Sequence, residues 1–119
     1  MASQGEIESF LKAVKTKILV FGIAFRPREK NLQALADLDI TSKSREEIIL
    51  SLQVVDYCSG PNKDLDVPGK PDYYVFGKSV NGKEVYIKLS PGLSGKMVDC
   101  MSFHSAEHSL SYPFKSPNK

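Results

Sequence analysis

The sequence predicts an α+β domain in which two to three helices pack on one face of a small antiparallel sheet of three to four strands. Amphipathic helical patterns in the first half of the chain and a hairpin signal with a further strand in the second half predict this class. A length of 119 residues provides for one core, since domains typically hold roughly 100–200 residues. We therefore expect a single domain over residues 1–119, ordered over about 6–114, with a flexible tail at 115–119.

The first elements are a helix and a buried strand. Residues 6–17 carry apolar side chains at the spacing of an amphipathic helix. The segment 18–25 is apolar apart from Gly22 and shows no polar alternation, which is typical of a buried strand. This run is far shorter than the roughly 20 residues that cross a bilayer, so a transmembrane segment is excluded.

Two further helices are expected before the sheet. Pro27 suits the first helical position, because a proline there loses no hydrogen bond and pre-sets φ. A second helix should start near Ser44, where Ser44 and Glu47 have the spacing of a capping box. Residues 56–71 contain three of the seven prolines together with glycines and aspartates, which predicts a loop. The buried stripe of the helix after Pro27 would consist of Leu32, Leu35, Ala36 and Leu38.

The strongest local signal is a β-hairpin over residues 73–90. Asn81 and Gly82 lie between two β-rich runs, and both tolerate the positive φ that a type I′ turn requires. A two-residue turn fixes the register, so Gly77 should oppose Tyr86. A third strand is expected over 97–104.

This register separates an apolar face, interrupted by Lys78 and Lys83, from a polar and aromatic face. The apolar face, with Tyr74, Phe76, Val80, Val85, Ile87 and Leu89, must cover the core. We expect Met101 and Phe103 on that side as well, which sends Cys100, Ser102 and His104 to the face of Tyr86 and Lys88. Gly77 leaves a gap in the second face where a ligand or another backbone could approach.

A histidine, a tyrosine and a lysine on one face include all the types of chemical group that metal-free cleavage of RNA needs. That reaction needs a group that removes the 2′-hydroxyl proton, a group that protonates the leaving 5′-oxygen, and cations that offset the charge on phosphorus. Arg26, Arg28 and Lys30 add positive charge at a helix start, which is unfavourable there unless an anion is bound. Each residue also has an ordinary interpretation: a surface histidine, cross-strand tyrosines and solvated cations.

Composition sets limits on other classes. The net charge of +2 permits a polyanionic partner without requiring one. Cys58 and Cys100 show no metal-ligand spacing, so we expect free thiols and no metal site. The acidic start of the chain lacks the pattern of a secretory signal, so we expect a cytoplasmic protein.

Five segments of the chain form a recognisable ordered set: Phe21–Ala36, Asp56–Pro61, Val75–Lys78, Glu84–Leu89 and Met101–Phe114. Together they resemble the MqsR (motility quorum-sensing regulator) family of toxins from bacterial type II toxin–antitoxin systems. The likeness spans about residues 6–114. It implies a compact α+β relative of the RelE-type ribonuclease fold, sequence-selective and metal-free cleavage of messenger RNA, and neutralisation by a cognate antitoxin.

The resemblance assigns the tyrosine and lysine of the family's catalytic strand to Tyr86 and Lys88. Better-known members have a lysine in the final strand, where this chain has His104, and a second lysine where it has Ser59 and Gly60. We therefore predict an endoribonuclease with an RNA substrate, an antitoxin partner and no cofactor. The alternatives are a non-catalytic module that binds RNA or protein, and a purely structural interaction protein. The predicted catalytic residues are His104, Tyr86 and Lys88, and the predicted RNA contacts are Arg26, Arg28, Lys30, Lys78 and Tyr73.

Overall fold

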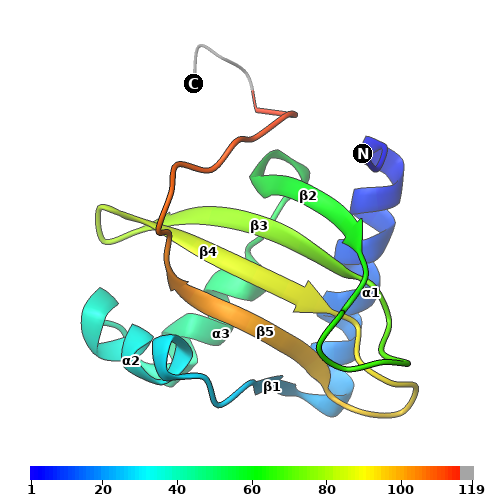
Figure 1. Ribbon diagram of the computed structural model, residues 1–119, viewed down its shortest axis with the longest axis horizontal. Coiled ribbons are helices and arrows are strands. Elements are labelled where there is room, and N and C mark those ends of the chain that lie inside the picture. Colours follow the sequence, from blue (N-terminus) through cyan, green and yellow to red (C-terminus); the bar gives the residue numbers. More distant parts are fainter. Residues whose placement is uncertain (116–119) are drawn as a thin grey trace.

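The computed structural model describes residues 1–115, and these form three α-helices and a five-stranded sheet in the order β1-β5-β4-β3-β2 (Figure 1). Of the tail predicted at residues 115–119, the part after Lys115 lies outside the described residues. None of the helices within residues 1–115 combines the length and apolar character that crossing a bilayer requires. The elements are α1 (Gln4–Phe21), β1 (Ile23–Phe25), α2 (Glu29–Leu38), α3 (Ser42–Leu50), a 3-10 turn η1 (Val54–Asp56), β2 (Tyr57–Asn62), β3 (Tyr73–Val80), β4 (Lys83–Ser90) and β5 (Val98–Ser105).

The predicted α+β class is confirmed, and the sheet is wider than expected. It is mixed, because β1 pairs parallel with β5, whereas the other neighbours are antiparallel. The predicted loop at 56–71 contains β2, which pairs with β3 through two register shifts. Pro61 lies within β2, and a proline is tolerated there because β2 is an edge strand.

Helix α1 runs four residues further than predicted and replaces the first half of the expected strand at 18–25. A capping box between Ser3 and Glu6 starts it, and Gly22, with φ of 86°, ends it. Ile18 continues the buried stripe of α1, whereas residues 19–21 are exposed. The β-propensity of this run is overridden because the helical stripe still reaches the core.

The starts of α2 and α3 also differ from the sequence prediction. Helix α2 begins at Glu29 with Arg28 as its N-cap, so Pro27 precedes the helix. Helix α3 is capped by Thr41, whose hydroxyl accepts a hydrogen bond from the Ser44 backbone N–H. The predicted buried stripe of α2 holds for Leu38 but is wrong for Leu32, which is 70% exposed, and for the exposed Ala36, while Leu35 is half-buried. The inward positions are taken instead by Asn31, Ala34 and Leu38.

The predicted hairpin and its register are confirmed: Asn81 and Gly82 have positive φ, and Gly77 pairs with Tyr86. Strand β5 brings His104 opposite Tyr86 and Ser102 opposite Lys88, as expected. A register shift between Lys88 and Leu89 then places Cys100 opposite Leu89. The expectation for Cys100 and Met101 is therefore wrong, since Cys100 lies in the core cluster and the buried Met101 lies outside it.

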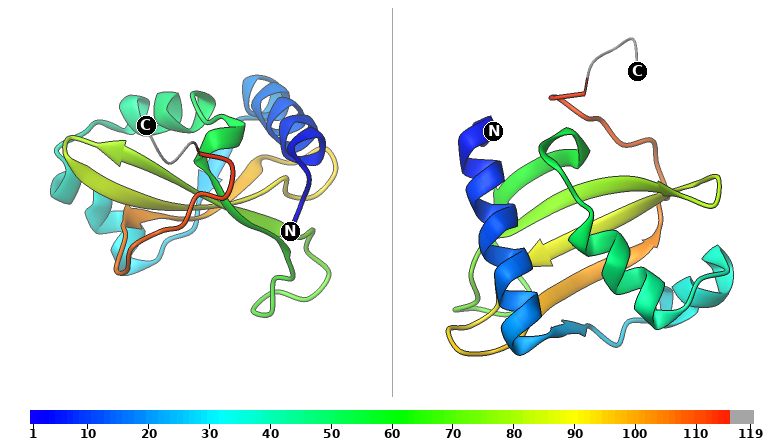
Figure 2. Two further views of the ribbon diagram at one scale, coloured as in Figure 1. Left: turned by 90° about the horizontal axis from the view of Figure 1, so that it is seen from above. Right: turned by 180° about the vertical axis from the view of Figure 1, so that it is seen from behind.

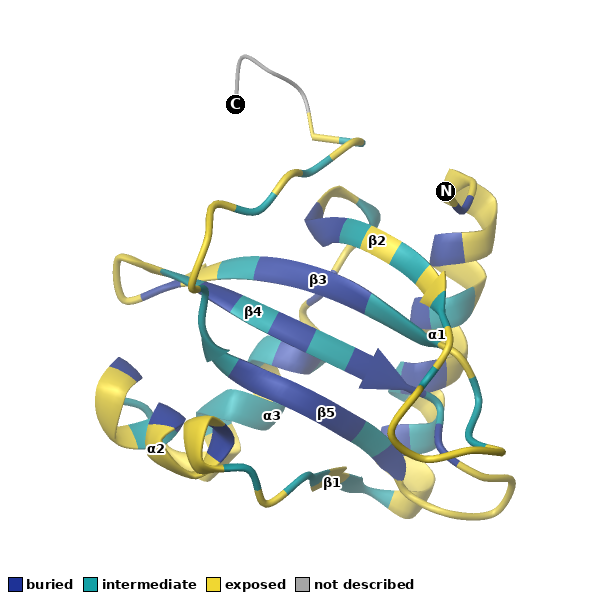
Figure 3. Ribbon diagram, viewed as in Figure 1, coloured by how far each residue is buried: buried dark blue, intermediate teal, exposed yellow. Residues whose placement is uncertain are grey.

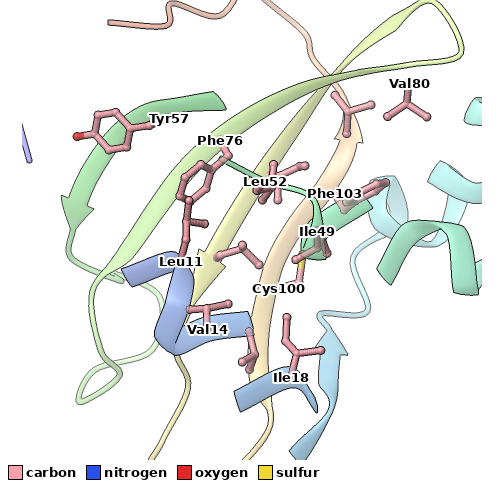
Figure 4. Close-up of a cluster of buried hydrophobic side chains, with 14 of the residues drawn as sticks. Leu11, Val14, Ile18, Ile49, Leu52, Tyr57, Phe76, Val80, Cys100 and Phe103 are labelled. Atoms are coloured by element: carbon pink, nitrogen blue, oxygen red, sulfur yellow. The ribbon is translucent and has the colours of Figure 1, made fainter. Parts of the chain in front are cut away.

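Helices α1 and α3 cover one face of the sheet (Figure 2), and the core lies between them and the strands. Figure 4 shows the core side chains Leu11, Val14, Ile49 and Phe76 converging in this layer. Strands β3, β4 and β5 hold most of the buried sheet residues, whereas the segment between β2 and β3 is largely exposed (Figure 3). The opposite face is crossed by the segment after β5, and α2 lies along the β5 side of the sheet (Figures 1 and 2).

Candidate functional site

A cleft of about 630 Å³ opens beside α2 on the sheet face that α1 and α3 leave uncovered. Strands β4 and β5 supply its floor, the first turn of α2 supplies one wall, and the segment after β5 supplies another. The cleft unites most of the residues that the sequence predicted for the site. Its lining residues are Arg28, Glu29, Lys30, Asn31, Tyr86, Lys88, Ser102, His104, Glu107, His108 and Leu110.

His104 and Tyr86 are cross-strand neighbours whose rings stack in the cleft. The ring centroids are 5.6 Å apart and the ring planes are inclined by 28°. The Nδ1 of His104 lies 2.9 Å from the carbonyl oxygen of Ser105. Because a carbonyl can only accept, the neutral imidazole carries its proton on Nδ1, which leaves Nε2 free to accept a proton.

Tyr86 is half-buried, and its burial raises the pKa of the phenol above the ordinary value for tyrosine. Tyr73 and Cys58 add to this shift of the pKa, while the positive charge of Arg28 opposes it. The phenol is therefore protonated at neutral pH. In this form it can donate a hydrogen bond to a ligand in the cleft.

Lys88 is the cation at the floor of the cleft. Burial lowers the pKa of its ammonium, and Arg28 and Arg26 lower it further, whereas Asp66 and Asp64 oppose the shift. Its Nζ lies 4.5 Å from the centre of the Tyr73 ring, which places Tyr73 beside the cleft although it is not one of the lining residues. Within residues 1–115, no carboxylate forms an ion pair with Lys88.

Arg28 and Lys30 reach the cleft from the start of α2, and both form exposed ion pairs. An Arg28 nitrogen lies 3.3 Å from Asp66, and Lys30 pairs with Glu107. Exposed pairs of this kind contribute little to stability, typically below about 1 kcal/mol. A ligand anion could therefore replace these carboxylates at small cost.

Arg26 and Lys78 are not brought into the cleft. Arg26 is largely buried and lies 2.7 Å from both Asp64 and Asp99, and the hydrogen bond to Asp99 raises the pKa of the guanidinium most strongly. Lys78 lies 3.1 Å from the buried Asp56. The charges of both residues are thus already paired within the protein.

Asn31, which is not among the residues predicted for the site, joins α2 to the sheet. Its side chain is 1% exposed and donates to the carbonyls of Arg26 and Met101, each at 3.0 Å. Its Oδ1 accepts from the Phe103 backbone N–H at 2.9 Å. These bonds hold the first turn of α2, with its cations, beside β5. In the sequence, the only sign of this role is that Asn31 is polar and directly precedes Leu32.

The gap predicted at Gly77 is filled by the chain itself. A Cβ atom at Gly77 would lie 2.7 Å from Leu110 Cδ1, and it would also collide with the hydroxyl of Tyr112. Glu84 anchors the same segment, because its carboxylate accepts from the Tyr112 hydroxyl at 2.7 Å and from the Leu110 N–H at 3.2 Å. This anchoring fixes the wall that brings His108, which the sequence analysis left aside, to the cleft.

The two cysteines are free, as predicted. Burial raises the pKa of the Cys58 thiol to about 12 and raises that of Cys100 as well. Both thiols are therefore protonated and poorly nucleophilic at neutral pH. Residues 1–115 contain no group of three or more histidine, cysteine, aspartate or glutamate side chains arranged to hold a metal ion.

The fold and the cleft define a small α+β protein with a basic and aromatic site on its open sheet face. Comparison of the chain with protein-family models, with curated proteins and with solved structures found no match.

Proposed function

We propose that this protein is an endoribonuclease that cleaves messenger RNA through attack of the 2′-hydroxyl, without a metal ion. The observation that supports this most is the cleft in which His104, Tyr86 and Lys88 lie on adjacent strands. An imidazole, a phenol and an unpaired ammonium provide proton transfer and charge stabilisation within one site.

The cleft suits the backbone and bases of single-stranded RNA. Arg28, Lys30 and Lys88 supply positive charge for phosphates. The rings of Tyr86 and Tyr73 offer surfaces on which bases can stack, an interaction worth about 1–3 kcal/mol for each base. Affinity for RNA should accordingly fall as the salt concentration rises.

In the proposed reaction, Nε2 of His104 accepts the proton of the 2′-hydroxyl, and the 2′-oxygen attacks phosphorus. The bond from phosphorus to the 5′-oxygen breaks, which leaves a 2′,3′-cyclic phosphate and a 5′-hydroxyl. The leaving oxygen takes its proton from a second group in the cleft, and the Tyr86 phenol and the ring of His108 are the candidates for this role. Lys88 and Arg28 offset the added negative charge on the phosphoryl oxygens.

We further propose that the chain is a toxin of the MqsR family that acts in the bacterial cytoplasm and is neutralised by a cognate antitoxin. This step rests on the ordered sequence segments quoted above and on the α+β fold. A small neighbouring gene that encodes a DNA-binding protein would support it. Co-expression of that gene should then restore growth to cells that produce this chain.

The test is cleavage of a defined RNA by the purified protein, with end analysis of the fragments. We expect 2′,3′-cyclic phosphate ends from the unaltered protein and loss of cleavage in His104→Ala combined with Tyr86→Phe. Lys12→Ala, which removes an exposed lysine of α1 on the other side of the sheet, is a matched control outside the cleft. If the double variant fragments RNA and arrests growth as the unaltered protein does, the assignment of the site is wrong.

The basic and aromatic surface also favours a second candidate, a module that binds RNA without cleaving it. Lys88 above the Tyr73 ring would serve such binding equally well. Binding that weakens steeply with salt, together with intact RNA ends, would identify this function.

A further inference from the structure

Ser102 presents its hydroxyl to the cleft, and this hydroxyl has no hydrogen-bond partner among residues 1–115. The residue is 3% exposed and lines the cleft floor. Among residues 1–115, no group forms a hydrogen bond with its Oγ, although the hydroxyl of Ser90, also in the sheet, has two such contacts. Among the described residues, the fully buried side-chain atom without a partner is Nε of Arg45, so the Ser102 Oγ is not sealed off but opens onto the cleft, where it can donate a hydrogen bond to a polar ligand.

Two cations that line the cleft with Ser102, Lys88 and Arg28, favour a negatively charged ligand. Lys88 is its register partner on β4 and forms no ion pair with a described carboxylate. Arg28 reaches the same cleft from the N-cap of α2 and makes no capping bond with its side chain. One hydroxyl and two cations therefore converge from three separate elements.

The carboxylates around the cleft pair with the arginines and with Lys30 but not with Lys88. Asp66 lies beside Arg28, Glu107 beside Lys30, and Asp64 beside Arg26. Glu29 is the remaining acid that lines the cleft. The lining itself holds three cations, Arg28, Lys30 and Lys88, and two carboxylates, Glu29 and Glu107, so it carries one more positive than negative charge before either histidine is counted.

We propose that Ser102, Lys88 and Arg28 form an oxyanion subsite that holds one phosphate group of the ligand. The Ser102 hydroxyl donates a hydrogen bond to a phosphoryl oxygen, and the two cations bind the remaining oxygens. This inference deepens the proposed function and rests on it for the identity of the ligand as RNA.

The subsite lies at the right distance from the histidine for the proposed reaction. Ser102 and His104 are two residues apart on the same face of β5, which corresponds to about 7 Å along a strand. A phosphate bound at Ser102 would thus bring its neighbouring ribose to Nε2 of His104. Ser102 is then a phosphate-binding residue that sets the register of the chain being cleaved.

The test uses inorganic phosphate and a 2′-deoxy dinucleotide, neither of which can be cleaved by 2′-hydroxyl attack, as probes in NMR titrations. We expect saturable shifts of the Ser102 and His104 amides, and about tenfold weaker binding in Ser102→Ala, since hydrogen bonds to charged groups are among the stronger ones. Ser102→Thr, which keeps the hydroxyl, should retain more affinity than Ser102→Ala. Ser79→Ala removes an exposed serine of β3 and should bind as the unaltered protein does.

The outcomes separate the subsite from the proposed function. Equal phosphate binding by Ser102→Ala and the unaltered protein, or no saturable binding by either, overturns the subsite. Weakened binding in Ser102→Ala without RNA cleavage by the unaltered protein supports the subsite and overturns the nuclease. Binding of inorganic phosphate without the dinucleotide supports an oxyanion subsite for free phosphate rather than for a phosphodiester.

Discussion

Removal of the Asn31 side chain should destabilise the protein strongly although the residue belongs to a surface helix. Its amide makes three hydrogen bonds, to Arg26, Met101 and Phe103, and all three partners are backbone groups. In Asn31→Leu, a leucine of similar volume fills the space but leaves one N–H and two carbonyls of the sheet edge without this partner. At about 1 kcal/mol for each group, the lower end of the usual range, the loss is about 3 kcal/mol.

Urea unfolding measures this loss directly, provided that the slope of the unfolding free energy against urea is unchanged. For a chain of this length, the same loss corresponds to a fall in Tm of about 12 °C. Leu32→Ala is the matched control, because Leu32 is the next residue of α2 and is 70% exposed. A loss below about 1 kcal/mol in Asn31→Leu would refute the reasoning, since water would then be satisfying these groups in place of the amide.

Three further changes test other parts of the structure. Asp64→Asn should lower the free energy of unfolding at neutral pH, because the hydrogen bond from Arg26 lowers the pKa of the Asp64 carboxyl in the folded protein. This stabilisation is complete above the ordinary aspartate pKa and is lost as the pH falls through the lowered value. Urea unfolding at several pH values should therefore show the two proteins becoming more alike in acid. Gly77→Ala should displace the segment that contains Leu110 and Tyr112, because the new Cβ would collide with both side chains, and limited proteolysis of that segment should be faster. Cys58 should react slowly with a thiol reagent at neutral pH and faster after unfolding, because burial raises its thiol pKa to about 12.

The sequence predicts the centre of the site well because its geometry is local. Asn81 and Gly82 fix the hairpin register, and alternation along the strands then places Tyr86 and Lys88 on one face. The same alternation correctly assigns His104 and Ser102. It fails at Cys100 and Met101, because a register shift inserts an extra residue that side-chain periodicity does not reveal.

The walls of the site could not be predicted, because they depend on contacts between distant parts of the chain. Asn31 meets Phe103 at a separation of 72 residues, and Glu84 holds Tyr112 at a separation of 28. A single sequence shows that Asn31 is polar but does not show which backbone groups need a partner. The position of His108 in the cleft follows from the Glu84 anchor, so it could not be inferred either.

The basic residues around the cleft show why charge alone is a poor guide to a binding site. Arg26 and Arg28 look equivalent in the sequence, yet the first is largely buried between two carboxylates and the second forms one exposed pair. Extracting Arg26 for a ligand would leave Asp64 and Asp99 without their partner in a partly buried position, which is costly. Arg28 can exchange Asp66 for a phosphate at little cost, and Lys88 forms no ion pair with a carboxylate of residues 1–115. The cations available to a ligand are thus those that the protein pairs weakly or not at all.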